Sequence, residues 1–205
     1  MSLDPDVFAS LCEAAAAISA PLHATIVRLG PIAIPPPTHL LVADRLFVEV
    51  VNQQISMRAA LAIWARIASE AAERGLAPRD LFVAGEEAVL RACGVSANKI
   101  RALLAIREAE AVGALNDDLA LLPQRDRAAV LCRIRGVGPW TADMIGIFHF
   151  LDPDIWPAGD VAAVGTLRRL SGRTDDVAVA ANFAPYRSIL ARYMWHSRDT
   201  KAAAA

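Results

Sequence analysis

The sequence predicts an all-α protein on three observations. Apolar residues recur at the spacing of one helix face along most of the chain. Segments with this spacing are separated by proline, glycine and the small polar residues that begin helices. No segment alternates apolar and polar residues convincingly enough to predict a strand. With 205 residues, the chain is long enough for a substantial core and for one large or two small domains.

The first predicted helices precede a proline-rich connector. Asp4 and Pro5 are typical of a helix start, and Pro21 ends that helix. A second helical segment covers 23–29 and stops at a glycine. Residues 31–37 are rich in proline and make the clearest break in the chain.

Helical segments then follow one another to the end of the chain. An apolar helix runs into a polar turn, and Ser56 is expected to cap the helix after that turn. Ser96 is expected to begin a later helix. The segments predicted after the connector are 40–51, 57–67, 78–83, 86–93, 97–112, 126–133, 161–170 and 182–196.

Composition excludes several classes of protein. Lys plus Arg total 21 against 22 Asp plus Glu, so a DNA-binding surface would have to be a local basic patch. Charges interrupt the apolar runs before they reach membrane-spanning length, and we expect neither a secretory signal nor a membrane partner. Cys12, Cys93 and Cys132 are widely spaced, which predicts neither a disulfide framework nor a zinc or iron–sulfur site. The four histidines are scattered without paired spacing.

A turn with two glycines is the most informative segment. Residues 136–142 have the sequence Gly-Val-Gly-Pro-Trp-Thr-Ala. Gly136 and Gly138 are expected to bracket Val137 in a turn too tight for Cβ atoms, which frees N–H groups for a phosphate. The proline fits the first position of the next helix, and Thr141 lies in its first turn. Such a helix-hairpin-helix turn binds nucleic-acid backbone without recognising base sequence.

The order of the motifs resembles that of a known family. After an apolar helix come Asn-Gln-Gln-Ile-Ser at 52–56, the glycine turn, Trp-Pro-Ala-Gly-Asp at 156–160, and a last helix with Pro-Tyr-Arg-Ser-Ile-Leu-Ala-Arg-Tyr-Met-Trp at 185–195. This combination resembles the helix-hairpin-helix DNA glycosylases, and among them the 3-methyladenine DNA glycosylase II family, which excises alkylated bases. The resemblance covers roughly 40–198, and the motifs together are far more specific than any one alone.

The resemblance implies one compact glycosylase unit over 1–205 with two helical lobes. Too few residues precede Leu40 for the β-rich N-terminal domain of larger family members. One lobe would cover about 40–130 and contain a wedge turn. The other would combine the N-terminal helices with about 131–200 and carry the hairpin, the catalytic Asp and the terminal helix.

Asp160 is the expected catalytic residue. Breaking an N-glycosidic bond passes through an oxocarbenium-like sugar, which a fixed carboxylate stabilises while it orients the attacking water. Gly159 allows a sharp turn, and the helix expected from Val161 presents its positive end to the carboxylate. Taken alone, Asp160 is more simply a helix N-cap. The hairpin upstream at family-like spacing favours catalysis.

Trp140 and Trp195 are implied as walls of the base pocket. Relatives that also cut the strand carry a lysine after the hairpin proline, where its amine forms a Schiff base. Trp140 cannot be that nucleophile, so a monofunctional glycosylase without lyase activity is expected. The competing interpretation of Trp140 is a core aromatic on an amphipathic helix.

Flipping a base out of the duplex requires a group that fills the hole. In the family this wedge comes from the turn that here contains Gln53, Gln54 and Ile55, and Gln54 aligns with the intercalating position. Many relatives have an apolar residue there. Gln54 either enters the duplex and bonds the orphaned base, or is a solvated loop residue.

The resemblance also implies partners and a cation site. No cofactor is expected, although hairpins of this family can hold Na⁺ or K⁺ through carbonyls, here those of Cys132, Ile134 and Gly136. The expected partner is double-stranded DNA containing a damaged base. We expect a monomer in a reducing cytoplasm, associated with the nucleoid.

The predicted activity is hydrolysis of the N-glycosidic bond of alkylated purines, 3-methyladenine and 7-methylguanine, in base excision repair. Two alternatives stay open at this point. One keeps the enzyme and changes the lesion to an oxidised or mismatched base. The other is a helix-hairpin-helix adaptor that binds DNA without catalysis.

Overall fold

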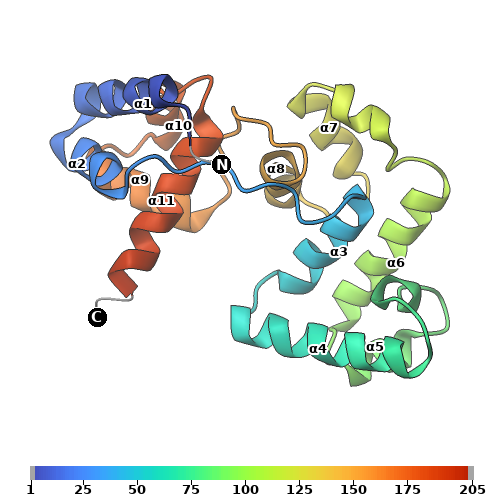
Figure 1. The fold of residues 1–205 in the computed structure, drawn as a ribbon. Coiled ribbons are helices and arrows are strands. Elements are labelled where there is room, and N and C mark those ends of the chain that lie inside the picture. Colours follow the sequence, from blue (N-terminus) through green and yellow to red (C-terminus); the bar gives the residue numbers. More distant parts are fainter. Residues whose placement is uncertain (1–2, 203–205) are drawn as a thin grey trace. The chain divides into compact units, whose positions relative to one another are not determined.

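A computed structural model describes residues 3–202, with side chains through 198 (Figure 1). The described residues form helices joined by turns and contain no strand, which confirms the all-α prediction. They divide into two compact units. The terminal unit comprises 3–37 and 146–202, and the central unit is Thr38–Ile145. None of the described helices combines the length and apolar character that crossing a bilayer requires.

The terminal unit joins the two ends of the chain. Helices α1 and α2 pack on each other, α11 packs on α9, and α2 contacts both α9 and α11. In Figure 1 the blue N-terminal helices accordingly lie beside the orange and red C-terminal ones. The helices of this unit are α1 (Pro5–Ile18), α2 (Ala20–Leu29), α9 (Val161–Ser171), α10 (Asp176–Ala181) and α11 (Arg187–Ala202).

One apolar core holds these helices together. It draws on each of them, including the fully buried side chains of Leu22, Leu167 and Leu190. Tyr193 is also fully buried, and its hydroxyl donates to the Gly30 carbonyl at 2.7 Å. That bond satisfies the polar end of the buried ring and fixes the start of the proline-rich connector against α11.

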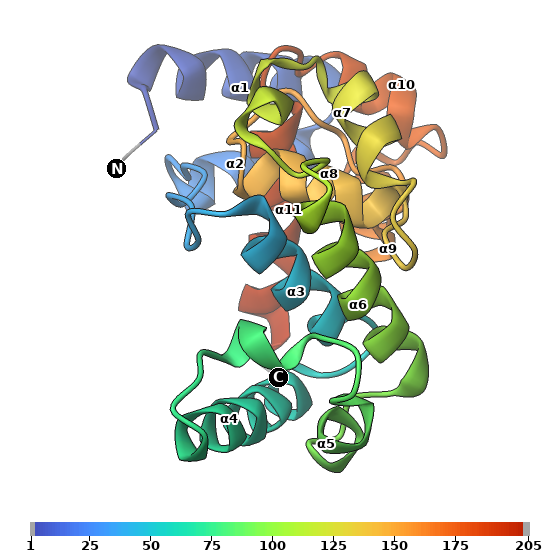
Figure 2. The ribbon, with the colours of Figure 1, turned by 90° about the vertical axis from the view of Figure 1, so that its right-hand side faces the viewer.

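The central unit is built around α3 and α6, which pack side by side (Figure 2). Ser56 caps α4 by accepting the Ala59 amide at 3.2 Å, and Ser96 begins α6, as the sequence predicted. The elements of this unit are α3 (Val42–Asn52), α4 (Met57–Glu73), η1 (Pro78–Leu81), α5 (Glu87–Ala92), α6 (Ala97–Ala111), η2 (Asp117–Leu121), α7 (Gln124–Leu131) and most of α8 (Pro139–Phe148).

The division differs from the predicted lobes in the place of the hairpin. The sequence put the hairpin in the lobe that carries Asp160, whereas the structure puts 136–141 in the central unit, together with the expected wedge turn. The physical reason lies in contacts within that unit, because Gln53 bonds the hairpin backbone and Ala102 lies against Gly136.

Candidate active site and DNA-binding turns

Asp160 is the N-cap of α9 in the terminal unit. Its Oδ1 accepts the Ala163 amide at 2.7 Å, and its own amide donates to the Pro157 carbonyl at 2.8 Å. The cap places the carboxylate at the N-terminal end of the α9 dipole. The capping and catalytic interpretations of the sequence are therefore compatible, because one geometry serves both.

Trp195 reaches the same carboxylate from α11. Its indole Nε1 donates to Asp160 Oδ1 at 3.0 Å. The Phe148 ring lies 5.8 Å from the Trp195 ring, tilted by 31°, and the Arg192 guanidinium lies 5.8 Å from the centre of the Phe148 ring. Sequence reasoning placed Trp195 in the base pocket and did not find this hydrogen bond, which spans 35 residues of sequence.

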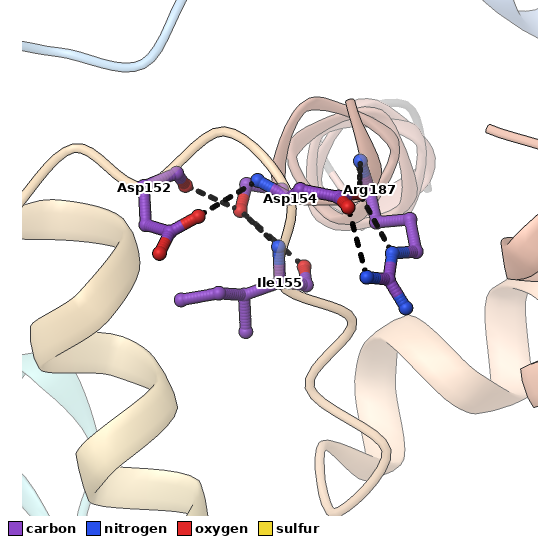
Figure 3. Close-up of polar contacts among 5 residues, drawn as sticks. Asp152, Asp154, Ile155 and Arg187 are labelled. Atoms are coloured by element: carbon purple, nitrogen blue, oxygen red, sulfur yellow. Dashed lines mark hydrogen bonds and ion pairs between the residues drawn. The ribbon is translucent and has the colours of Figure 1, made fainter. Parts of the chain in front are cut away.

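The segment that leads to Asp160 is anchored at its start by α11 (Figure 3). Asp154 and Arg187 form a two-pronged ion pair, with Nε to Oδ1 at 2.7 Å and Nη2 to Oδ2 at 2.9 Å. This contact lowers the pKa of Asp154 from its ordinary value. Ser188 Oγ accepts the Ile155 amide at 2.9 Å and donates to the Asp152 carbonyl at 2.7 Å. Asp152 and Asp154 thus hold the backbone of this segment in place.

A second anchor lies closer to Asp160. The Trp156 indole Nε1 donates to Asp176 Oδ2 at 2.9 Å, and Arg168 donates to Asp176 Oδ1 at 2.7 Å through Nη2. Burial raises the pKa of Asp176, but the bonds from Trp156 and Arg168 outweigh it, so the net change is downward. Arg168 therefore forms a structural ion pair with Asp176.

The hairpin turn lies in the central unit. Gly136 has φ +85°, in the left-handed region, and a Cβ added there would lie 2.3 Å from the Ala102 Cβ. The prediction that both glycines exclude a Cβ is correct for Gly136 and wrong for Gly138. Gly138 is not among the glycines with positive φ, and a Cβ there would meet nothing within 4 Å.

The backbone bonds of the hairpin show which N–H groups are committed. The buried Val137 donates its amide to the Ile134 carbonyl at 3.1 Å, so that N–H is not offered outward. The Gly138 carbonyl accepts the Ala142 amide at 2.9 Å and starts α8. The Gly138 and Thr141 amides have no backbone acceptor among the described residues, as is usual at the start of a helix. These two donors fit an anion best.

Gln53 and Gln54 have different roles in the expected wedge turn. The Gln53 Nε2 donates to the Gly136 carbonyl at 3.2 Å and to the Thr141 hydroxyl at 3.1 Å. Gln53 therefore ties the wedge turn to the hairpin, a role that the sequence did not indicate. Gln54 is exposed and has φ +54°, a left-handed conformation that is strained for a residue with a Cβ. Of the pair, only Gln54 has the exposure that a wedge requires, and Ile55 is half-buried beside it.

A cavity of about 270 Å³ lies where these turns meet. Lys99 lines it, and burial lowers the pKa of its amine. The Lys99 Nζ donates to the Val51 carbonyl at 2.9 Å. The lining residues are Gln53, Gln54, Ser96, Asn98, Lys99, Ala102 and Gly136.

Helix α8 carries Trp140, which the sequence singled out, and the acidic residue Asp143. Trp140 is half-buried in the second position of the helix. Trp140 belongs to the central unit and Trp195 to the terminal unit, so a base pocket that uses both stays a prediction. Asp143 accepts Gln124 Nε2 at 3.2 Å, and burial raises its pKa to about 6 against the smaller opposing effect of that bond.

Two of the three carbonyl oxygens of the implied cation site already accept a hydrogen bond. The Ile134 carbonyl accepts the Val137 amide, and the Gly136 carbonyl accepts Gln53. A carbonyl oxygen has two lone pairs, so these bonds are compatible with a Na⁺ or K⁺ ligand role for Cys132, Ile134 and Gly136. The described side chains include no group of three His, Cys, Asp or Glu residues suited to a metal ion.

A hairpin that presents helix N-terminal amides, together with a carboxylate fixed at a second helix N-terminus, defines the class of helix-hairpin-helix DNA glycosylases. No family model matches the chain. DNA-3-methyladenine glycosylase 1 of Schizosaccharomyces pombe is 30% identical over 166 residues, which cover 74% of this chain and 70% of that protein.

Two solved structures have the same fold. The S. pombe 3-methyladenine DNA glycosylase, in complex with abasic DNA, matches with a TM-score of 0.77 and 26% identity over 90% of this chain and 94% of that chain. A DNA-3-methyladenine glycosidase of Bacillus halodurans matches with a TM-score of 0.78 and 26% identity over 99% and 94%. The chain belongs to the DNA-3-methyladenine glycosylase family.

Proposed function

We propose that the chain is a monofunctional DNA glycosylase that hydrolyses the N-glycosidic bond of alkylated purines in duplex DNA and so begins base excision repair. The observation that carries this proposal is the fixed carboxylate of Asp160, which accepts hydrogen bonds from the Ala163 amide and the Trp195 indole at the N-terminus of α9, in a chain of this family. A non-catalytic adaptor has no need of such a group.

DNA binding is assigned to the turns of the central unit. The Gly138 and Thr141 amides would meet phosphate oxygens of the backbone, and Gln54 would enter the duplex where the damaged nucleotide leaves it. The S. pombe relative was solved with abasic DNA, which is the product of base release. This supports the assignment of DNA as the partner.

Chemistry is assigned to Asp160. As the bond to the base lengthens, positive charge develops on the sugar, and the carboxylate stabilises that charge electrostatically. It also orients the water that completes hydrolysis. Trp140 stands where a lyase has its amine, so water is the nucleophile and the product is an intact abasic site.

The proposed substrates are 3-methyladenine and 7-methylguanine. A purine alkylated at N3 or N7 is positively charged and leaves without strong acid catalysis. Indole walls attract such a cation by about 0.5–2 kcal/mol beyond stacking. Selectivity from the pocket is therefore modest, and the quality of the leaving group provides the rest.

The test is release of base from duplex DNA with defined lesions. We expect 3-methyladenine and 7-methylguanine to be released well ahead of 8-oxoguanine, uracil and hypoxanthine. Strands should break only after alkali or heat, and borohydride should trap no covalent complex. Faster release of neutral lesions would show that the substrates are oxidised or mismatched bases and not alkylated purines. Binding of lesion DNA without release of any base would favour a non-catalytic DNA-binding adaptor. A covalent complex trapped by borohydride would indicate an amine nucleophile, for which Lys99 is the candidate.

A further inference from the structure

The hydrogen bond between Trp195 and Asp160 carries an inference that rests on the proposed function. The Ala163 amide at 2.7 Å and the Trp195 Nε1 at 3.0 Å donate to the same oxygen of Asp160, Oδ1. The torsion that turns a carboxylate about its own axis is soft, so an aspartate with one donor keeps considerable rotational freedom. A second donor on the same oxygen removes much of that freedom.

Trp195 is itself well fixed, which makes it a useful donor. It directly follows Tyr193 and Met194 of the apolar core on α11, and it packs against that core. The Phe148 ring lies against its indole. The indole N–H is therefore positioned by packing that does not involve the carboxylate. Hydrogen bonds to a charged acceptor are about twice as strong as neutral ones.

We propose that Trp195 is a positioning residue for Asp160, in addition to its expected place at the base pocket. Its N–H holds Oδ1 at the helix N-terminus and so sets the direction in which the carboxylate faces the sugar. Trp195 in this role acts through Asp160 and does not touch the reacting atoms. Through this bond Trp195 affects how well Asp160 stabilises the sugar cation, and this effect is the same for every lesion.

This role makes a different prediction from that of a pocket wall. A wall that attracts cations favours 7-methylguanine over a neutral base such as hypoxanthine. Loss of a positioning bond slows release of both bases by one factor, because Asp160 faces the same sugar in both cases. The ratio of the two rates therefore distinguishes the roles, whereas loss of activity alone does not.

The positioning role is tested with Trp195→Phe, which removes the indole N–H and keeps an aromatic ring. Single-turnover rates are measured on 7-methylguanine and hypoxanthine duplexes, with the dissociation constant for abasic DNA measured beside them. We expect both rates to fall by at least about tenfold, the size of one hydrogen bond to a charged group, with less than a twofold change in binding. Hypoxanthine gains nothing from cation attraction, so its rate reports the positioning bond alone. In an Asp160→Asn background, Trp195→Phe should have no further effect. Trp64→Phe is the matched control, because it removes an indole donor to Asn52 in the central unit and should leave both rates unchanged.

A second readout is independent of activity. The chain has four tryptophans, so the indole N–H signals can be assigned by NMR. Asp160→Asn should move the Trp195 indole proton upfield and leave that of Trp64 in place. An unmoved Trp195 signal, a loss confined to 7-methylguanine, or full activity of Trp195→Phe would each overturn the inference. Failure of the wild-type protein to release any base would instead refute the proposed function, and the NMR result would still decide whether Trp195 holds Asp160.

Discussion

The two units of the molecule fix their functional groups in different ways. In the terminal unit, the segment before Asp160 is held by side chains, through the Asp154–Arg187 pair and the Trp156–Asp176 bond. In the central unit, the hairpin is held through its own backbone and one amide side chain, Gln53. A carboxylate that must face one atom needs several anchors. A turn that presents N–H groups to a phosphate needs the correct backbone and little else.

The largest expected effect tests the terminal unit. Asp160→Asn should reduce base release by at least about a thousandfold, because it removes the charge that stabilises the sugar cation. Asparagine caps helices as well as aspartate does, so the melting temperature should change little. Affinity for lesion DNA, measured by fluorescence anisotropy, should remain near the wild-type value.

The control for Asp160→Asn is Asp175→Asn. Asp175 caps α10 through the Ala178 amide at 3.0 Å, so the change is chemically the same at a second helix of the same unit. Its activity should equal that of the wild type. Substantial base release by Asp160→Asn would refute the assignment of Asp160 as the catalytic group.

The two hairpin glycines test the central unit. Gly136→Ala puts a Cβ 2.3 Å from Ala102 at φ +85°, which should destabilise the fold by roughly 2–4 kcal/mol. Gly138→Ala meets open space and should leave the melting temperature unchanged. The amide N–H remains, but the new methyl group lies beside it and hinders the approach of a phosphate, so binding of lesion and undamaged DNA should weaken alike by at most about tenfold, the size of one hydrogen bond. A loss confined to lesion DNA would place Gly138 at the base pocket instead.

A further expected effect, on stability alone, concerns Asp143 and pH. Burial raises the pKa of Asp143 to about 6, so the folded state favours the protonated form. When the pH rises from the ordinary pKa of an aspartate through about 6, the unfolded chain ionises first and the folded protein loses stability. Below that range Asp143 is protonated in both states and costs no stability. Asp143→Asn should therefore stabilise the protein by about 1–2 kcal/mol above pH 7, allowing for partial solvent exposure. Melting curves at pH 4 and pH 8 check this, and an equal change at both values would contradict it.

Local features were predictable from the sequence because their causes are local. The caps at Ser56 and Ser96 lie within three residues of the amides they satisfy. The glycine at position 136 permits the left-handed turn that the structure has there. Nothing in residue type distinguished Gly138, whose surroundings turned out to be open.

Contacts between segments that are distant in the chain could not be predicted from the sequence. The Gln53 bond to Gly136 spans 83 residues, and the Arg187 bond to Asp154 spans 33. Glutamine and arginine bond many partners on protein surfaces, so their presence does not indicate which partner they bond. For the same reason the hairpin was assigned to the wrong neighbours, since its link to the wedge turn is a single glutamine amide that no local pattern indicates.

That glutamine amide has a consequence for how the protein can vary. Because Gln53 fixes the spacing between the hairpin and the wedge turn, the residue at the tip, Gln54, takes no part in holding either turn. Gln53 therefore has a structural role, whereas Gln54 has none in these two turns. Under the proposed wedge role of Gln54, substitutions at position 54 change the group that fills the gap in the duplex and leave the Gln53 bonds in place, and residues that adopt a φ of +54° fit there best.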